Sequence, residues 1–416
     1  MSKVRSIAVN ICRFILAATF IFSGYVKAID PLGTQYKLQD YAEAAGLAVV
    51  APDWLTLCLS VMLSALEFCL GIFLLFALHR RQTSRITLVF MAVMTLITLW
   101  LVIANPIEDC GCFGDALKLT NGQTFAKNIV LLLCALVVAW QPLRMVRFIS
   151  EPNQWIGVNY SIIFIVLSSL WSLYTLPPFD FRPYHVGASI REGMEIPDDA
   201  PQPKFETTFI MEKNGQQQEF SLENYPDSTW TFVDSKTVEI EKGYVPPIHD
   251  FSVVLMADQQ DLTDQILSNP GHTLLLIAPH LQKADDTNFG EINQIHDYAV
   301  EHDIPFYCLT ASTDKAIARW VDLTGAEYPF CTTDETTLKT IIRSNPGLVL
   351  LHDGAVAGKW SHNQLPTTEE LLSPSEISTT NKIIAILLWF ALPLLLLTLA
   401  DRTWAWTKWL RKSRKT

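Results

Sequence analysis

The sequence predicts an α-helical membrane bundle joined to an α/β domain, and three observations lead to that fold class. Half of the 416 residues are hydrophobic and only 18% are charged. Six apolar segments are each long enough to cross a bilayer core of about 30 Å, which takes roughly 20 helical residues. From residue 250 onward, segments with strand and helix character alternate, as is typical of an α/β sheet.

The charge is divided unevenly along the chain. Residues 177–378 carry 12 basic and 32 acidic side chains, whereas the remaining residues carry 19 basic and 10 acidic ones. This pattern predicts an acidic soluble domain attached to a membrane part with basic flanks. The isoelectric point near 5.3 offers no basic surface for phosphate, which excludes nucleic-acid binding.

The six predicted spans cover most of the apolar sequence. The first is interpreted as a retained helix rather than a cleaved signal peptide, because it is long, lacks a clear small-residue cleavage site and is closely followed by four more spans. The spans are 8–29, 54–78, 86–104, 126–145, 157–176 and 382–400.

Basic residues predict the orientation, because Lys and Arg in short loops resist translocation. They cluster at the N-terminus, in the second and fourth connections and in the C-terminal tail. Both termini are therefore expected in the cytoplasm of a bacterium, with the chain in its inner membrane. The loops at 30–53 and 105–124 and the domain at 177–378 are expected on the external, periplasmic side. The basic residues are Lys3, Arg5, Arg13, Arg80, Arg81, Arg85, Arg144, Arg147, Arg402, Lys408, Arg411, Lys412, Arg414 and Lys415.

The second external loop contains two thiols, Cys110 and Cys112, separated by Gly111. Such a pair can close a very small disulfide ring, for which glycine permits the unusual backbone. A strained disulfide is easily reduced and suits electron exchange. A structural turn or an inert disulfide is the alternative. A metal site is disfavoured, because zinc takes four ligands and no second cysteine pair or close histidine is present.

A carboxylate, Glu67, falls near the middle of the second span. An ionised carboxylate there costs several kcal/mol unless it is paired, so it is expected to face the bundle interior. Lys27 is the nearest candidate cation, although its position also fits a side chain that reaches to the interface. Two interpretations stay open. One is a functional contact with a proton or a quinone, the one cofactor candidate; the other is a structural role, as a buried pair or as a neutral Glu hydrogen-bonded between helices. Cysteines 12, 58, 69 and 134 are interpreted as packing residues.

Three segments in order resemble the DoxX-like membrane proteins, and most closely their MauE (methylamine utilisation) branch. They are residues 22–31, the span that contains Glu67 and ends at Gly71, and residues 110–114. The resemblance covers about the first 145 residues and implies a four-helix bundle similar to that of vitamin K epoxide reductase relatives. It also implies a part in maturation of the disulfide-rich small subunit of methylamine dehydrogenase, with Cys110 and Cys112 as the redox pair. The chain departs from this pattern in having no CxxC that faces a quinone within the bundle.

Residues 250–375 resemble a thioredoxin fold. The resemblance makes Pro346 the counterpart of the cis-proline that precedes the fourth strand, and Asp353-Gly354 predicts a tight hairpin turn. A working thioredoxin has CxxC after its central strand, but residues 277–284 contain no cysteine, which favours binding or scaffolding over catalysis. Strands are expected at 251–256, 273–278, 304–310, 347–352 and 355–360, and helices at 260–268, 286–302, 313–324, 335–344 and 367–372.

The remaining part of the acidic domain, residues 177–249, predicts a small β-rich segment with a hairpin turn at Asn214-Gly215. Cys308 and Cys331 are interpreted as packing residues, with a mutual disulfide or redox exchange with the first thiol pair as alternatives. No metal site is predicted, because the histidines have no ligand spacing; they are His280, His296, His302, His352 and His362.

Two functional hypotheses follow. The first is a thiol-disulfide oxidoreductase-like activity, in which Cys110 and Cys112 exchange electrons with envelope proteins. The alternative is a non-catalytic, membrane-anchored assembly factor that binds client proteins on its external domain. In both, membrane lipid surrounds the spans. The predicted organisation is a bundle at 1–148, a fifth helix at 157–176, a β-rich segment at 177–249, a thioredoxin-like domain at 250–375, a sixth helix at 380–400 and a cytoplasmic tail at 401–416.

Overall fold

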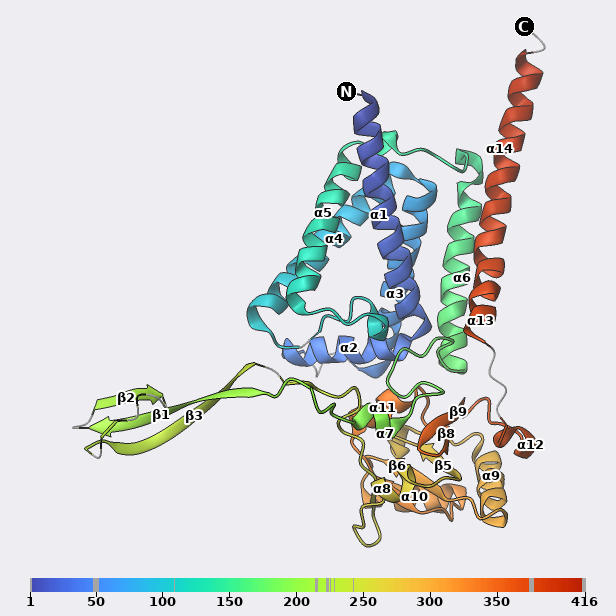
Figure 1. The fold of residues 1–416 in the computed structure, drawn as a ribbon. Helices are drawn as coiled ribbons and strands as arrows, with labels where there is room; N and C mark the ends of the chain where they lie inside the picture. The colour runs from blue at the N-terminus through green and yellow to red at the C-terminus, as the bar shows by residue number, and fades with distance from the viewer. Residues whose placement is uncertain are drawn as a thin grey trace.

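The computed structural model of the chain contains a bundle of long helices and an α/β domain from which a narrow sheet projects (Figure 1). The start of α1 and the end of α14 lie at one end of the bundle, and the α/β domain lies at the other. The residues described are 2–47, 52–107, 109–213, 216–221, 224, 226–227, 229–241, 243–373 and 378–413.

Within the described residues, six helices are long and apolar enough to cross a membrane, and all six coincide with predicted spans. The fourth ends at Trp140 rather than at residue 145, because Pro142 begins a separate 3-10 turn. The helices are α1 (Ser2–Ile29), α3 (Asp53–Phe76), α4 (Arg80–Ala104), α5 (Asn121–Trp140), α6 (Gln154–Tyr174) and a rod formed by α13 (Thr379–Ile386), a π turn (Leu387–Ala391) and α14 (Leu392–Ser413).

Helices α1, α3, α4 and α5 form a four-helix group, in which α1 packs on α3 and α5, and α4 packs on α5. Helix α6 lies against α3, and the C-terminal rod lies beside α6 (Figure 1). Aromatic rings join the rod to the bundle: Phe390 packs 4.3 Å from Phe164 between ring centroids and 5.2 Å from Phe68. The fifth and sixth spans therefore belong to the same helical body as the first four.

Two glycines allow α1 and α3 to approach closely. A Cβ atom added to Gly24 would lie 2.4 Å from the backbone nitrogen of Phe68, and one added to Gly71 would lie 2.7 Å from that of Ile21. Small residues at such crossings let helix backbones pack against each other in membranes. This contact places the end of α1 against the middle of α3.

The prediction of a loop at 30–53 is wrong for its first part, because residues Pro31–Ala44 form helix α2. The Asp30 side chain accepts a hydrogen bond from the Gly33 backbone N–H at 2.9 Å, and Pro31 occupies the first helical position. A capping Asp followed by Pro is a helix start signal. Helix α2 lies across the end of the bundle, between the bundle and the α/β domain (Figure 1).

The α/β domain is built on a six-stranded sheet with the order β4-β7-β6-β5-β8-β9. Strands β5, β6 and β7 are parallel, whereas β8 pairs antiparallel with β5 and β9. The elements are α7 (Ile190–Met194), β4 (Val254–Leu255), α8 (Thr263–Leu267), β5 (His272–Ile277), α9 (Phe289–Glu301), β6 (Phe306–Thr310), α10 (Asp314–Thr324), β7 (Phe330–Thr332), α11 (Glu335–Ile341), β8 (Gly347–His352), β9 (Ala355–Ser361) and α12 (Thr368–Leu371).

Most predicted strands of this domain are confirmed, with two corrections. The strand expected at 251–256 shortens to the two residues of β4, and the sequence analysis missed β7, which has only three residues after Pro329. The hairpin turn is confirmed, since Asp353 and Gly354 join β8 to β9 with φ values of +49° and +70°. Such a backbone suits the twist of a two-residue hairpin.

Both faces of the sheet are buried. On β5, Leu275 and Ile277 pack into one core cluster, and Leu274 and Leu276 pack into another on the opposite face. Successive strand residues point to opposite faces, so a sheet covered on both sides reads as a continuous apolar run. The first cluster also contains side chains from before residue 250, namely Tyr184, Ile190 and Ile248.

The β-rich part of residues 177–249 is confined to an arm that projects away from the rest of the protein (Figure 1). Its sheet has the order β2-β1-β3 and antiparallel pairing. The predicted turn at Asn214-Gly215 lies outside the described residues, as do Arg414 and Lys415 of the tail. The strands are β1 (Lys204–Lys213), β2 (Gln216–Ser221) and β3 (Thr231–Glu241).

We expect Gly24→Ala to lower the stability of the bundle by about 1–3 kcal/mol, because the added methyl group would force α1 away from α3. The midpoint of thermal unfolding of the detergent-solubilised protein measures this loss. Gly122→Ala is the matched control, since a Cβ atom there meets no atom within 4 Å. Equal midpoints for the two variants would contradict the close-packing interpretation.

Candidate functional site

The two predicted redox thiols lie in a tight turn at residues 109–116, which we call the CxC turn. The sulfur atoms of Cys110 and Cys112 are 2.9 Å apart, and both residues are free thiols. Gly111 adopts a φ of +63° between them, a backbone that favours glycine. The Asp109 carboxylate accepts the Gly111 backbone N–H at 2.8 Å and so stabilises the turn.

Residues of α1 and α2 hold this turn in place. The Ser23 hydroxyl of α1 donates to the Cys112 carbonyl oxygen at 2.5 Å, and the Tyr41 hydroxyl of α2 donates to the Cys110 carbonyl oxygen at 2.8 Å. Lys37 of α2 forms an ion pair with Asp109 at 3.3 Å. The turn is therefore packed against the end of the bundle, and only 6% of Cys110 is exposed.

The two thiols have different acidities. A hydrogen bond from Cys112 lowers the pKa of Cys110 to about 6, against the opposing effect of burial and with help from Tyr41, Lys27 and Lys127. The same hydrogen bond, together with burial, raises the pKa of Cys112 well above the ordinary thiol range. Because the thiolate is the more nucleophilic form of a cysteine, these opposite shifts favour Cys110 over Cys112 as a nucleophile.

The intramembrane charges and the CxC turn, which were predicted separately from the sequence, interact in the structure. Lys27 and Glu67 form an ion pair, with Nζ 2.5 Å from Oε2, and both side chains are buried. The Lys27 charge also acts on Cys110, whose pKa it lowers. Glu67 therefore has the cation that a buried carboxylate requires, and this cation lies next to the CxC turn.

A cavity of about 720 Å³ lies between the bundle and the α/β domain, and we call it the interdomain cavity. Both thiols of the CxC turn line it, as does Lys27. The opposite wall comes from residues 177–184, 247–250 and 336–343 of the α/β domain. This volume falls in the range of small-molecule sites, so the cavity has room for a ligand beside the sulfur atoms.

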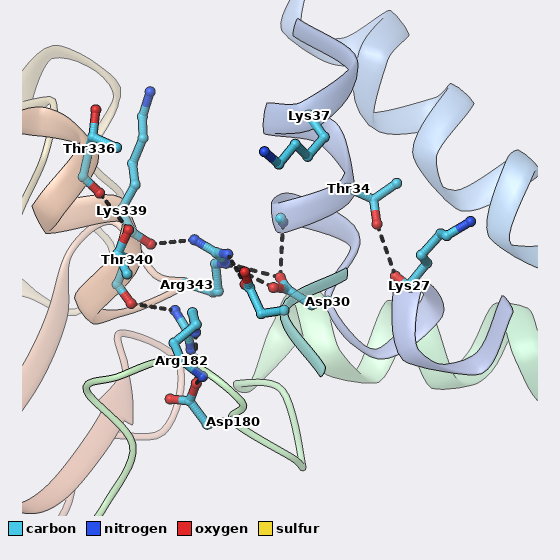
Figure 2. A network of polar contacts seen from close by, with 12 residues as sticks. Lys27, Asp30, Thr34, Lys37, Asp180, Arg182, Thr336, Lys339, Thr340 and Arg343 are labelled. Carbon is cyan, nitrogen blue, oxygen red and sulfur yellow. Dashed lines mark hydrogen bonds and ion pairs between the residues drawn. The ribbon is translucent and has the colours of Figure 1, made fainter. Parts of the chain in front are cut away.

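Arg343 of the α/β domain joins the two walls of this cavity. Its Nε atom lies 3.0 Å from each carboxylate oxygen of Asp30, and its Nη2 atom lies 3.3 Å from Asp115 of the CxC turn. Its guanidinium group also lies over the ring of Tyr36, 5.3 Å from the centroid. Figure 2 shows this network, in which Arg343 extends from the α/β domain to Asp30 at the start of α2.

The environment of Arg343 keeps its guanidinium group charged. Burial acts to lower its pKa, but the carboxylates of Asp30 and Asp115 outweigh burial and raise it. A second arginine, Arg182, donates to the Thr340 carbonyl oxygen at 3.0 Å and to Asp180 at 2.7 Å, as Figure 2 shows. These bonds connect the end of α11 to the chain that follows α6.

Pro346 lies just after this network, and the Asn345-Pro346 peptide bond is cis. The Asn345 side chain donates to the His280 carbonyl oxygen at 2.9 Å, so this bond lies beside the turn at 279–284 that lacks cysteine. The thiols of the α/β domain are elsewhere: Cys308 and Cys331 are free and fully buried in its core. Burial raises the pKa of Cys331 to about 12.

Among the described residues, no group of three or more His, Cys, Asp or Glu side chains gathers as a metal site. His280 lies 3.0 Å from Glu335, and His362 accepts or donates a hydrogen bond with Ser344 at 2.9 Å. Both histidines have polar partners within the fold.

The sequence analysis did not identify Tyr41, Lys127, Arg343 and Asp30 as site residues. Asp30 carried a readable signal, because Asp followed by Pro starts a helix. The other three carried none, since Tyr41 and Arg343 come from distant parts of the sequence and Lys127 looks like an ordinary basic residue of the helix that follows the turn. Their parts in the site arise from how α2, α5 and α11 pack around the CxC turn.

Comparison with known proteins supports the bundle assignment. Residues 5–141 match the family described as methylamine utilisation protein MauE, and residues 205–242 match a domain of unknown function, DUF8463. A search of curated proteins found no match for this chain. The first third of the chain is thus MauE-like, and with its six apolar helices the chain is a multi-pass membrane protein.

Alkylation of Cys110 should report its low pKa. We expect the rate of reaction with iodoacetamide to rise through pH 6 and to level off above about pH 7, whereas an ordinary thiol, with a pKa of roughly 8.5, continues to gain reactivity. Peptide mass spectrometry of the purified protein measures the rate at Cys110. In Cys112→Ala the midpoint should move upward, because the hydrogen bond that lowers the pKa most is lost. A wild-type midpoint above pH 8 would contradict this assignment.

Proposed function

We propose that this MauE-like membrane protein exchanges disulfides through Cys110 and Cys112 in the extracytoplasmic compartment. The observation that carries the proposal is the division of acidity between two thiols in contact: the pKa of Cys110 is lowered to about 6, whereas that of Cys112 is raised. One thiol then attacks and the other resolves, as two-cysteine exchange requires. Both thiols line the interdomain cavity, where a substrate sulfur atom has room to approach.

The exchange conserves atoms and electrons. The Cys110 thiolate attacks one sulfur atom of a client disulfide, which forms a mixed disulfide and releases one client thiolate that takes up a proton. Cys112 then loses its proton and attacks the Cys110 sulfur atom, which releases the second client thiol. The net result is a reduced client and a Cys110–Cys112 disulfide: two electrons pass to the client, which takes one proton from Cys112 and one from solvent. The reverse sequence oxidises a client dithiol.

Lys27 and Glu67 support this exchange electrostatically. The Lys27 ammonium group stabilises the negative charge of the Cys110 thiolate in the reduced state. When the pair is oxidised and this charge disappears, Glu67 remains as the counterion of Lys27 at 2.5 Å. We propose a membrane quinone as the class of two-electron acceptor: after the reverse sequence has oxidised a client dithiol, the reduced Cys110–Cys112 dithiol and a quinone give a disulfide and a quinol.

We also propose that the α/β domain is thioredoxin-like and binds clients without performing exchange itself. Three features support this: the order β6-β5-β8-β9, the parallel pairing of β5 with β6 beside antiparallel β8 and β9, and a cis-proline directly before β8. Its turn at 279–284 has no cysteine. In this arrangement, the membrane bundle supplies the thiols and the α/β domain supplies a binding surface.

A non-catalytic role in envelope-protein assembly is the second candidate. The observation that favours it is the location of the two thiols in the α/β domain, Cys308 and Cys331, which are buried in its core. A client held only by this domain would meet no reactive sulfur atom there. In this alternative the CxC turn is a structural element, and clients dock on the α/β domain or the arm.

Trapping of mixed disulfides separates the two candidates. Cells that express Cys112→Ser should accumulate reducible adducts between Cys110 and client proteins, at least about tenfold more than cells that express Cys110→Ser, because the resolving thiol is missing. Acid quenching, alkylation and non-reducing electrophoresis measure the adducts. Cys58→Ser, which alters an exposed thiol on α3, serves as the control and should behave as wild type. If no adducts form and the pair never changes its redox state, the exchange function is wrong and the assembly role remains.

Reporter fusions test the proposed sidedness. Alkaline phosphatase, which is active only where disulfides form, should be active when it is inserted in the arm and inactive when it is fused after residue 413. The physical reason is the alternation of basic connections, which keeps both termini in the cytoplasm. A green fluorescent protein fusion that folds only in the cytoplasm gives the reciprocal control. Phosphatase activity at the C-terminus and none in the arm would overturn the proposed orientation.

A further inference from the structure

The α/β domain closes the interdomain cavity through contacts of unequal strength. Arg343 is 7% exposed and reaches two carboxylates of the bundle, Asp30 and Asp115. A second ion pair, between Lys283 and Asp53 at 2.6 Å, has side chains that are 64% and 57% exposed, and Lys339 lies over the Tyr36 ring, 4.9 Å from its centroid. An exposed ion pair contributes little, whereas removal of one partner from a buried pair is strongly destabilising. Arg343 therefore contributes most of the electrostatic attachment at this face.

The chain that follows α6 enters the α/β domain next to this contact, because Arg182 donates to the Thr340 carbonyl oxygen, three residues before Arg343. The domain is joined to α6 on one side and to α13 on the other, and these two helices run side by side (Figure 1). Arg343 contacts the bundle at α2 and the CxC turn. If the Arg343 contact breaks, the domain remains attached to α6 through the chain that follows it, which is the arrangement of a tethered lid.

The CxC turn packs against the bundle on one side, and Cys110 faces the interdomain cavity, whose opposite wall is the α/β domain. Cys110 is 6% exposed, and the space next to it is the interdomain cavity of about 720 Å³. That volume matches a small molecule or a short extended segment. A folded client protein carries its disulfide on a surface far larger than this space, so it cannot bring its sulfur atoms to Cys110 while the domain is closed.

We propose that Arg343 is a specificity-determining residue that latches the α/β domain over the CxC turn and selects substrates by size. With the latch closed, the Cys110–Cys112 pair reacts with small disulfides and thiols. Disulfides of folded proteins react only after Arg343 leaves Asp30 and Asp115. The inference rests on the proposed exchange function, but the latch is a property of the domain contact and is measured without redox cycling.

Size-dependent labelling of Cys110 tests the latch. The full-length protein in lipid nanodiscs is treated with N-ethylmaleimide or with a 5-kDa polyethylene glycol maleimide, and the reaction at Cys110 is followed by peptide mass spectrometry. In Arg343→Ala the rate with the large reagent should rise by about tenfold, because the lid is released, while the rate with the small reagent changes less than about twofold. Arg343→Lys should give an intermediate rate with the large reagent, since it retains the charge without the paired donors.

Lys283→Ala is the matched control, because it removes an exposed ion pair between the same two bodies and should leave both rates at wild-type values. Asp115→Asn removes one of the two latch carboxylates and should raise the large-reagent rate by a smaller factor, because Asp30 still holds Arg343. It tests the latch even if Arg343→Ala folds poorly. An unchanged large-reagent rate in both latch variants would overturn the proposal, and so would an equal rise with both reagents, which indicates general loosening. If labelling behaves as expected but no mixed disulfides form in cells, the exchange function fails and the latch stands.

Discussion

The site depends on one buried ion pair, between Lys27 and Glu67, at the place where α1 meets α3. A charged amine or carboxylate in the apolar interior of a membrane bundle needs a counterion, so each group requires the other. Gly24 and Gly71 permit the helix contact that brings them together, because a side chain at either position would strike the backbone of the facing helix. The same contact holds a positive charge next to the CxC turn. The acidity of Cys110 is thus coupled to helix packing within the bundle.

The interface between the bundle and the α/β domain shows that local charge, rather than net charge, decides how the two parts meet. Residues 177–378 carry a large acidic excess, yet this domain contacts the bundle through Lys283 and Arg343. The facing end of the bundle presents carboxylates at Asp30, Asp53 and Asp115. The few basic residues of an acidic domain are therefore placed where the bundle is acidic. Elsewhere, the acidic surface keeps the domain soluble.

In the proposed function, the arrangement separates two roles that a single thioredoxin-type domain combines. The two thiols belong to a turn held by Ser23 and Tyr41 of the membrane part, whereas the α/β domain forms the opposite wall of the cavity and its own thiols are buried. A turn held by hydrogen bonds from two helices keeps the sulfur atoms in register for exchange. If the proposed exchange occurs, a domain that lies over the CxC turn can control which molecules reach the thiols.

The sequence by itself determined the elements whose signals are local. The six spans were readable because a bilayer requires long apolar helices, and the strands from β5 to β9 were mostly readable from apolar runs between turn residues such as Asp353-Gly354. The Cys110–Gly111–Cys112 motif and the carboxylate of Glu67 within an apolar span were also recognisable, because each depends only on its neighbours in the sequence. Only the tertiary structure decided that Lys27 lies beside both Glu67 and Cys110, and that Arg343 meets Asp30 across 313 residues. Contacts between distant segments depend on how helices cross and how domains dock. That geometry results from the packing of all the elements together, and no local pattern of residues encodes it.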